Sequence, residues 1–355
     1  AYEIRPRDWS SDVCSSDLTR PSILVMAGGT GGHIFPGLAV AEYLRICGWN
    51  VSWLGNQNGM EYRLVQSCNF PFEAVEFGGL RGKGLKAKLM LPMNLARACF
   101  QSWKIMRRLK PSVVLGMGGY ITFPGGLVSK FLKRPLILHE SNSVAGSANL
   151  ALSKIAMRTL TGFPNTMDKA EWVGNPIRQE FDHMPEPALR YSQRQGPLSI
   201  LVVGGSLGAA ALNENIPAAL ALIPKDARPK VIHQAGDKHL AELQARYAEC
   251  GVEADIRPFI DDMPSAYAQA DLVICRSGAM TVSELAACGV ASCLIPFPYA
   301  IDDHQTANAR FLSDAKAAVL LPQKQLNPQD LAEMIQNIHR EDLKEMAVKA
   351  HALAK

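Results

Sequence analysis

A glycine-rich turn with one histidine follows the first apolar run of the chain. Residues Ile23–Pro36 have the sequence ILVMAGGTGGHIFP, in which a short strand-like run leads through four glycines into a helix start. Glycines let the backbone turn tightly, and the free N–H groups of a helix N-terminus can face an anion. His33 stands in the same turn and supplies a titratable imidazole. These residue types predict a diphosphate cradle with a base beside it.

The spacing of these glycines differs from that of a dinucleotide-binding turn. After Gly29 and Gly31, the position of the third glycine is occupied by Ile34. The next strand, Val51–Leu54, ends in Gly55 and not in an acidic residue that could bind a ribose. A nicotinamide is therefore disfavoured, and no cofactor is expected.

The order of strand, polar or glycine-rich turn and helix recurs and predicts the architecture. Further strands of this kind are expected over Val113–Gly116, Leu136–Leu138, Ser199–Val203 and Leu272–Cys275, the last before a helical run over Met280–Cys288. Strands that alternate with helices form parallel sheets, and 355 residues are more than one such sheet needs. We therefore expect an α/β fold with two parallel sheets that face each other across a cleft. Because ligands bind beyond the carboxyl ends of such strands, the site should lie in this cleft.

Proline and glycine residues between positions 173 and 187 interrupt the pattern, so we place a domain boundary after Ile177. This predicts a first domain over residues 21–177 and a second over residues 178–355. Residues 1–20 have neither helical nor strand periodicity and lack the apolar core of a signal peptide, so they are excluded from the fold. They are an artefact of expression or sequence assembly, or a disordered arm.

Composition limits the class of protein and divides the charge unevenly. No apolar run approaches the roughly 18 to 20 residues that span a bilayer. The eight cysteines lack metal-site spacing, which favours reduced thiols. Residues 21–177 have 17 Lys and Arg against 7 Asp and Glu, whereas residues 178–355 have 17 against 22. The first domain therefore carries a charge of +10 and the second −5, and residues 1–20 contribute the remaining −1 of the net charge of +4.

Most of the basic excess lies in Arg81–Lys110, which has nine basic residues and no acidic one. Leu, Met and aromatic residues, among them Phe100 and Trp103, are interleaved with these charges. An anionic membrane surface attracts such a stretch by about 1 kcal/mol per well-placed cation, so peripheral membrane docking is the preferred interpretation. An ordinary helix with an apolar stripe in the core is the simpler alternative. Nucleic acid binding is disfavoured by the acidic second domain and the few aromatic residues.

Nine segments, taken in order, are AGGTGGHIFPGLAVA, FGGLRGKG, VVLGMGGY, LHESN, VGNPIR, VVGGSLGA, FIDDM, CRSGAMTVSE and DDHQTANA. In order and spacing they resemble the MurG family of N-acetylglucosaminyltransferases, from about Ile23 to the end of the chain. The resemblance implies a GT-B fold, with two Rossmann-like domains. The implied reaction moves N-acetylglucosamine from UDP-N-acetylglucosamine to the C4 hydroxyl of N-acetylmuramic acid in undecaprenyl-diphosphate-linked muramyl pentapeptide (lipid I to lipid II), with inversion at the sugar carbon.

A direct inverting transfer needs a base on the acceptor hydroxyl and stabilisation of the departing diphosphate. The resemblance makes His33 the base, and a helix dipole there disfavours the cationic form of its ring. Hydrogen bonding to substrate or loop is the alternative role of this histidine. Thr30, Gly31 and Gly32 would line the same pocket. Asn142 would bind the sugar amide or hydroxyls, or else cap the following helix.

The resemblance assigns the donor to the second domain. Spacing alone indicates two residues there, Ser206 for the diphosphate and Glu284 for the ribose hydroxyls. The residues carried over by position are Arg178 and the amides of Ala279 and Met280 for the diphosphate, Ile260 with Phe259 for uracil, Gln305 with His304 for the sugar hydroxyls, and Thr281, Val282 and Ser283 beside them.

Several further expectations accompany the resemblance. The family continues beyond the position of Lys355 into a last helix that crosses back onto the first domain, so interdomain stability is expected to suffer here. Asp302 and Asp303 are adjacent and make poor joint ligands, so no metal is expected. The implied location is the cytoplasmic face of the bacterial inner membrane, with proteins of cell-wall synthesis or division as candidate partners. The rivals are another GT-B transferase that moves a UDP-sugar onto a lipid or natural product, and a non-catalytic relative that binds nucleotide or membrane.

Overall fold

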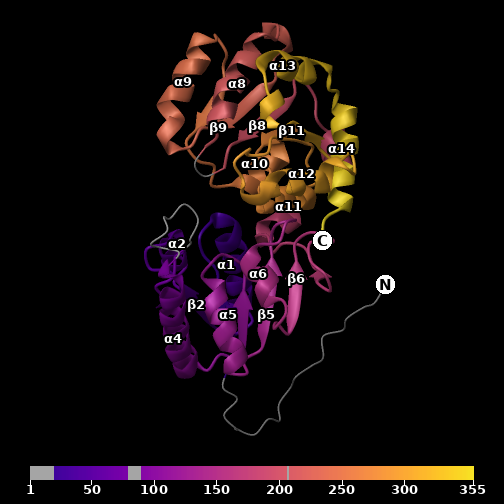
Figure 1. The fold of residues 1–355 in the computed structure, drawn as a ribbon. Coiled ribbons are helices and arrows are strands. Elements are labelled where there is room, and N and C mark those ends of the chain that lie inside the picture. The colour runs from indigo at the N-terminus through magenta and orange to yellow at the C-terminus, as the bar shows by residue number, and fades with distance from the viewer. Residues whose placement is uncertain (1–19, 79–88, 206–207) are drawn as a thin grey trace, which may run out of the picture.

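The computed structural model describes residues 20–78, 89–205 and 208–355, which form two α/β halves stacked end to end (Figure 1). Most of the segment FGGLRGKG, Ser206, and all but the last of residues 1–20 lie outside these ranges. Within the described part of the chain, no helix combines the length and the apolar character that crossing a membrane requires.

The first half contains a sheet of seven parallel strands in the order β3-β2-β1-β4-β5-β6-β7. Its strands are β1 (Ser22–Met26), β2 (Asn50–Gly55), β3 (Phe72–Ala74), β4 (Val113–Gly116), β5 (Leu136–Glu140), β6 (Arg158–Thr161) and β7 (Glu171–Trp172). Its described helices are α1 (Gly31–Ile46), α2 (Met60–Ser67), α4 (Leu91–Leu109), α5 (Thr122–Phe131) and α6 (Ser147–Leu152).

The second half contains a sheet of six parallel strands in the order β10-β9-β8-β11-β12-β13. Its strands are β8 (Ser199–Val203), β9 (Lys230–Gln234), β10 (Asp255–Arg257), β11 (Leu272–Cys275), β12 (Ser292–Leu294) and β13 (Val319–Leu320). Its helices are α8 (Ala210–Ala221), α9 (Leu240–Glu249), α10 (Met263–Gln269), α11 (Ala279–Cys288), α12 (His304–Ser313), α13 (Pro328–Asn337) and α14 (Arg340–Ala352).

Both sheets are buried on both faces, which explains why their central strands are unbroken apolar runs. In β1, Ile23 and Val25 pack with α1 and α2, while Leu24 and Met26 pack with α4, α5 and α6. The central strand β8 of the second sheet divides its side chains between two cores in the same way. A strand with water on one face would alternate polar and apolar residues instead. The structure confirms the predicted fold class.

The strand orders create one switch point in each sheet. Strand β1 lies between β2 and β4, and β8 lies between β9 and β11, so the connections leave each central strand in opposite directions. The glycine-rich turn after β1 and the GMGGY turn after β4 meet at the first switch point. There Gly119 has a φ of +84°, and an added Cβ would lie 2.2 Å from the carbonyl oxygen of Gly28. Only a glycine allows this contact between the two turns.

The chain passes from the first half to the second through residues 173–198, which include the 3-10 helix η1 (Gln179–His183) and helix α7 (Pro187–Ser192). The predicted boundary after Ile177 falls in this passage. Helix α7 packs against α14, and the Tyr191 hydroxyl donates to the carbonyl of Asp271 (2.7 Å) and accepts from the Ala291 N–H (3.1 Å). The passage is thus anchored to the second sheet.

Helix α14 lies on the same half, and Lys355 reaches the junction, where its Nζ is 5.3 Å from the Trp172 ring.

Tyr191→Phe should lower the free energy of unfolding by about 1–3 kcal/mol, because the buried Ala291 N–H loses this hydroxyl acceptor. Chemical denaturation measures the effect. Tyr299→Phe is the matched control, since that tyrosine is 82% exposed, and it should change stability by less than about 0.5 kcal/mol. Equal stability of the two variants would show that the hydroxyl does not anchor the passage.

Candidate active site

Two helix N-termini meet where the halves join. Helices α1 and α11 contact each other across the junction. Thr30 caps α1 and Gly278 caps α11, yet neither residue forms a side-chain capping hydrogen bond, and neither helix has an acidic residue in its first turn. The first-turn N–H groups are therefore free of the usual capping partners, which makes both helix ends suitable for anions.

His33 lies in the first turn of α1, packed against the turn after β4. An added Cβ on Gly118 would lie 2.6 Å from the imidazole Nδ1, so the ring occupies the space that this glycine leaves. The pKa of His33 is lowered, chiefly by burial, while the charge of Glu140 opposes the shift. His304 at the start of α12 lowers the pKa further. Because the pKa lies below its ordinary value of 6.5, the neutral ring predominates near pH 7, as a base requires.

The carboxylate of Glu140 organises the loop after β5. It is almost fully buried, and it accepts hydrogen bonds from Asn149 Nδ2 (2.9 Å), the Gly146 N–H (3.0 Å) and the Asn142 N–H (3.1 Å). Gly146 is the N-cap of α6, so the expected alternative role of Asn142 as a helix cap is wrong. One acidic side chain therefore fixes the conformation of this loop through hydrogen bonds to three of its residues.

Asn308 of α12 joins this loop to the second half. Its side chain is fully buried, and its Oδ1 accepts from the N–H (2.9 Å) and the hydroxyl (2.8 Å) of Ser143. Its Nδ2 donates to Asn142 Oδ1 (3.4 Å) and to the carbonyl of Ser277 (3.3 Å), just before α11. The sequence interpretation missed Asn308 as a site residue, although it lies within the segment DDHQTANA.

The predicted donor residues fall into different environments. Residues 279–281 form the first turn of α11. The side chains of Val282 and Ile260 are buried in the core, so a base could meet only the backbone of Ile260. The hydroxyl of Ser283 accepts from Asn175 Nδ2 (2.9 Å), which places it in a contact between the passage and α11.

Gln305 ties the start of α12 to two neighbouring turns. Its Oε1 accepts from the Phe297 N–H (2.9 Å), and its carbonyl accepts from the Ser277 hydroxyl (2.8 Å). The predicted sugar-binding side chain is thus already held in place beside the N-terminus of α11.

Glu284 and Arg178 lie close together in the second half. Burial raises the pKa of Glu284 to about 7, while the charge of Arg178 and the hydroxyl of Tyr267, 3.4 Å from Oε2, oppose the shift. The Arg178 guanidinium lies 5.1 Å from the ring of Phe181, at the start of η1. A carboxyl group near its titration point with a cation beside it can accept hydrogen bonds from a diol.

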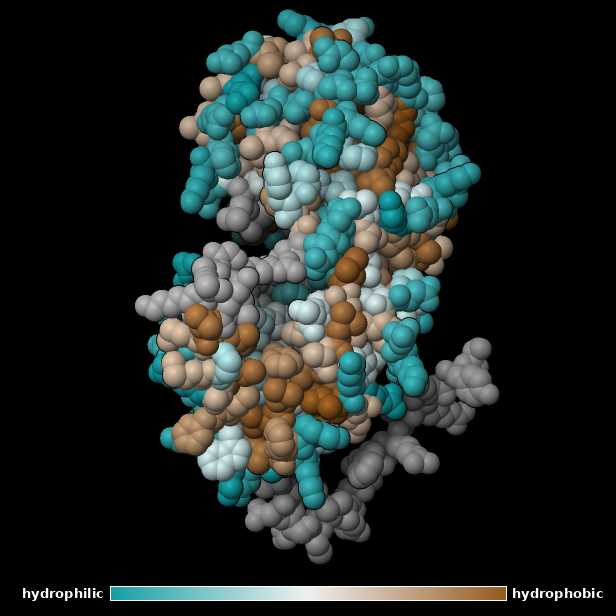
Figure 2. All heavy atoms as spheres, in the orientation of Figure 1, coloured by the Kyte–Doolittle hydropathy of each residue, from teal (hydrophilic) through white to brown (hydrophobic). Residues whose placement is uncertain are grey.

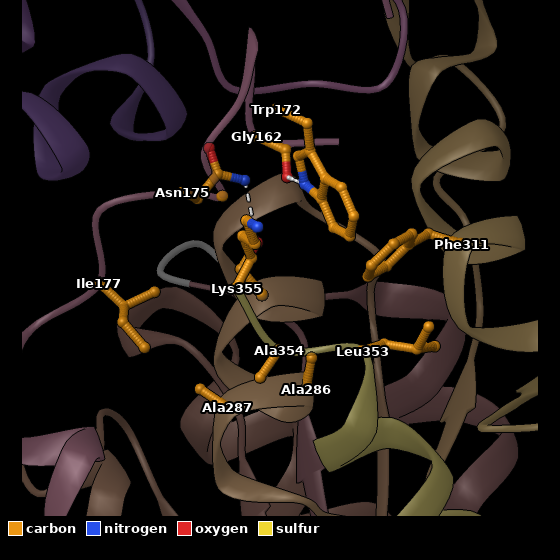
Figure 3. Close-up of a pocket in the computed structure, with 12 residues that line it drawn as sticks. Gly162, Trp172, Asn175, Ile177, Ala286, Ala287, Phe311, Leu353, Ala354 and Lys355 are labelled. Carbon is orange, nitrogen blue, oxygen red and sulfur yellow. Dashed lines mark hydrogen bonds between the residues drawn. The ribbon is translucent and has the colours of Figure 1, made fainter. Parts of the chain in front are cut away.

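A cavity of about 20 Å³ lies at the junction, lined by Trp172, Asn175, Phe311, Leu353 and the Ser283 side of α11 (Figure 3). This volume holds about one water molecule and no sugar nucleotide. In the described ranges, no group of three or more His, Cys, Asp and Glu side chains is placed to hold a metal ion.

Glu284→Gln should change how stability depends on pH. The folded pKa of about 7 is above the ordinary value of 4.5, so the stabilising contribution is fully present below about pH 4.5 and is lost as the pH rises through 7. Urea denaturation at pH 5 and pH 8 should show the variant gaining stability relative to the original chain at the higher pH. Glu253→Gln, at an exposed position, is the control and should show no such gain. A gain in stability at pH 8 for Glu253→Gln alone would contradict the raised pKa of Glu284.

Comparisons with known proteins agree along the whole fold. The N-terminal domain of glycosyltransferase family 28 matches residues 23–161, and its C-terminal domain matches residues 199–355. The chain is 86% identical over 338 residues to the UDP-N-acetylglucosamine--N-acetylmuramyl-(pentapeptide) pyrophosphoryl-undecaprenol N-acetylglucosamine transferase of Polynucleobacter asymbioticus, covering 95% of each chain. It is 59% identical to the transferase of the same name from Ralstonia nicotianae, covering 96% of this chain and 94% of the relative.

Solved structures give the same result. The crystal structure of Acinetobacter baumannii MurG superposes with a TM-score of 0.84 at 41% identity, covering 94% of this chain and 96% of that one. A glycotransferase of kitacinnamycin has a TM-score of 0.66 at 14% identity and shares the fold alone. The resemblance in nine segments is thereby confirmed, and the chain belongs to the MurG family of glycosyltransferases, within glycosyltransferase family 28.

Proposed function

We propose that this chain transfers N-acetylglucosamine from UDP-N-acetylglucosamine to the muramyl pentapeptide carried on undecaprenyl diphosphate, the step from lipid I to lipid II of peptidoglycan synthesis. The observation that carries the proposal is the 86% identity, over 95% of both chains, to a transferase named for these two substrates. The two helix ends without side-chain capping bonds and the partly buried His33 supply the chemistry that such a transfer needs.

The proposed mechanism assigns one task to each helix end. Neutral His33 takes the proton from the C4 hydroxyl of N-acetylmuramic acid as that oxygen attacks the anomeric carbon of the donor. The first-turn N–H groups at Ala279 and Met280, with Arg178 nearby, stabilise the charge that develops on the UDP diphosphate. Glu284 accepts hydrogen bonds from the ribose, and Gln305 and Asn142 contact the sugars. One displacement of this kind inverts the anomeric carbon.

A transfer assay tests the function directly. Labelled N-acetylglucosamine should pass from its UDP donor to a short-chain analogue of the muramyl lipid, and an equal concentration of UDP-glucose should compete poorly. Transfer to other lipids or natural products in preference to this analogue would favour the rival GT-B transferase. Binding of UDP with no transfer to any acceptor would favour the non-catalytic relative.

His33→Ala should lower kcat for this transfer by about 10²–10⁴-fold, because general-base catalysis contributes about that much. Its Kd for UDP should stay the same, since the donor is assigned to the second half. His239→Ala, on the surface of the second half, is the control and should keep full activity. Loss of UDP binding together with transfer would mean that His33 supports the structure instead.

We also propose that the first half docks on an anionic membrane surface. Figure 2 shows apolar side chains gathered on the half that contains α4, α5 and α6 in Figure 1. The large exposed apolar side chains of α4, α5 and α6 are Met93, Phe100, Trp103, Phe131 and Leu150, and we call them the α4–α6 patch. Helix α4 buries a separate stripe in the core, with Ala98, Ile105 and Met106. Packing of α4 into the core therefore does not require the exposed aromatic residues.

Cations accompany the aromatic residues of the patch. Lys104 Nζ lies 4.7 Å from the Phe100 ring, and the Arg107 guanidinium lies 5.1 Å from the Trp103 ring. A lipid-linked acceptor and a UDP-linked donor fit the cytoplasmic face of the inner membrane, where proteins of cell-wall synthesis or division would be the neighbours. The part of Arg81–Lys110 before Leu89 lies outside the described residues.

Lys104→Gln with Arg107→Gln should weaken binding to anionic vesicles, measured by sedimentation, by about thirtyfold, because each of the two cations near such a surface contributes about 1 kcal/mol. Added salt should weaken binding of the original chain more than that of the variant, and turnover of a soluble acceptor should not change. Lys230→Gln with Lys324→Gln, on the second half, is the matched control. Equal sedimentation of all three proteins would contradict docking through α4.

A further inference from the structure

The glycine-rich turn rests on a buried carboxylate that the proposed reaction does not use. Glu61, at the start of α2, is fully buried. Its Oε1 accepts from the Asn56 N–H (3.0 Å), and its Oε2 accepts from the Gly29 N–H (3.3 Å). One side chain thus receives two backbone donors, one from the turn after β1 and one from the turn after β2.

Three glycines leave the space for this carboxylate. An added Cβ would lie 2.5 Å from Glu61 Oε1 at Gly28, 2.9 Å from its Cγ at Gly55, and 2.2 Å from Oε2 at Gly59. Real Cβ atoms do not approach other atoms so closely, so any of these side chains would displace the carboxyl group. The sequence around both turns therefore accommodates an acidic side chain at this position.

The hydrogen bond to Gly29 bears on the position of the base. Gly29 has a φ of +92°, a conformation that other residues rarely adopt, and its N–H is directed to Glu61. The next residue, Thr30, accepts from the His33 N–H (3.1 Å) and the Ile34 N–H (3.3 Å) through its carbonyl. The first turn of α1 is thus attached to the peptide that Glu61 holds.

We propose that Glu61 is a positioning residue for the transfer reaction: its carboxylate fixes the Gly29 peptide and thereby sets where His33 meets the acceptor hydroxyl. This inference rests on the proposed function. Two N–H donors converge on the side chain, and only a carboxylate offers an acceptor oxygen to each. A glutamine would offer one oxygen and turn its NH₂ group toward the other N–H, so the two turns could not both be held.

The test compares Glu61→Gln with the original chain in the transfer assay. We expect kcat to fall about tenfold or more, because small misplacements of a reacting group reduce rate strongly. The KM for UDP-N-acetylglucosamine should change less than about twofold, since the donor is assigned to the second half. Glu42→Gln, the same change of charge at an exposed position of α1, should leave kcat and KM unaltered.

A spectroscopic measurement separates positioning from stability. In protein labelled with ¹⁵N-glycine, Glu61→Gln should shift the amide signals of Gly29, Gly31 and Gly32, and Glu42→Gln should not. A residue that only stabilised the fold would lower Tm and leave kcat per folded molecule unchanged, and that outcome overturns the proposal. Unmoved glycine signals would overturn it as well.

A second variant keeps the proposal testable should Glu61→Gln not fold. Gly59→Ala retains the acid but places a methyl carbon 2.2 Å from Oε2, and the φ of −86° at Gly59 suits alanine. It should reproduce the fall in kcat and the shifted glycine signals; original kcat with unshifted signals would overturn the proposal. Absence of transfer by the original chain would contradict the proposed function instead, and the glycine signals would then decide the role of Glu61.

Discussion

Asn308 fastens the two halves of the molecule together beside the N-terminus of α11. Its buried amide accepts two hydrogen bonds from Ser143 and donates to Asn142 and to the carbonyl of Ser277. Because a buried amide without partners is costly, these bonds favour one relative placement of the β5 loop and the start of α11. The loop after β5 and the N-terminus of α11 are therefore held by the same side chain. The bond between Asn175 and Ser283 holds the passage to the same helix.

The site depends on backbone groups more than on side chains. Helices α1 and α11 both begin without a capping hydrogen bond from a side chain. Those N–H groups stay available for the diphosphates that the proposed function requires. The arrangement also explains the glycines at 118 and 119, which let the turn after β4 close on the turn after β1 without covering it.

The features that depend on local sequence pattern could be predicted from the sequence. The runs Val113–Gly116, Ser199–Val203 and Leu272–Cys275 are strands with those bounds, because burial on both faces leaves them continuously apolar. His33 could be singled out because glycines and a helix start surround it. Glu61 and Asn308 could not, since a lone acid in a polar helix or one asparagine in a motif acquires its role only from partners about 30 to 165 positions away. The pKa of Glu284 likewise depends on burial that no local pattern reveals.

The two halves also differ in what they expose, and this bears on how two unlike substrates reach one site. The first half carries the positive charge and the α4–α6 patch, whereas the second is acidic and carries the uncapped end of α11. An acidic half is repelled by an anionic surface to which a basic half is attracted, so docking would orient the molecule as well as bind it. An acceptor held in the membrane by its lipid would then approach His33 through the first half. The soluble donor would enter on the second half, away from the lipid, and the two would meet at the junction that Asn308 holds.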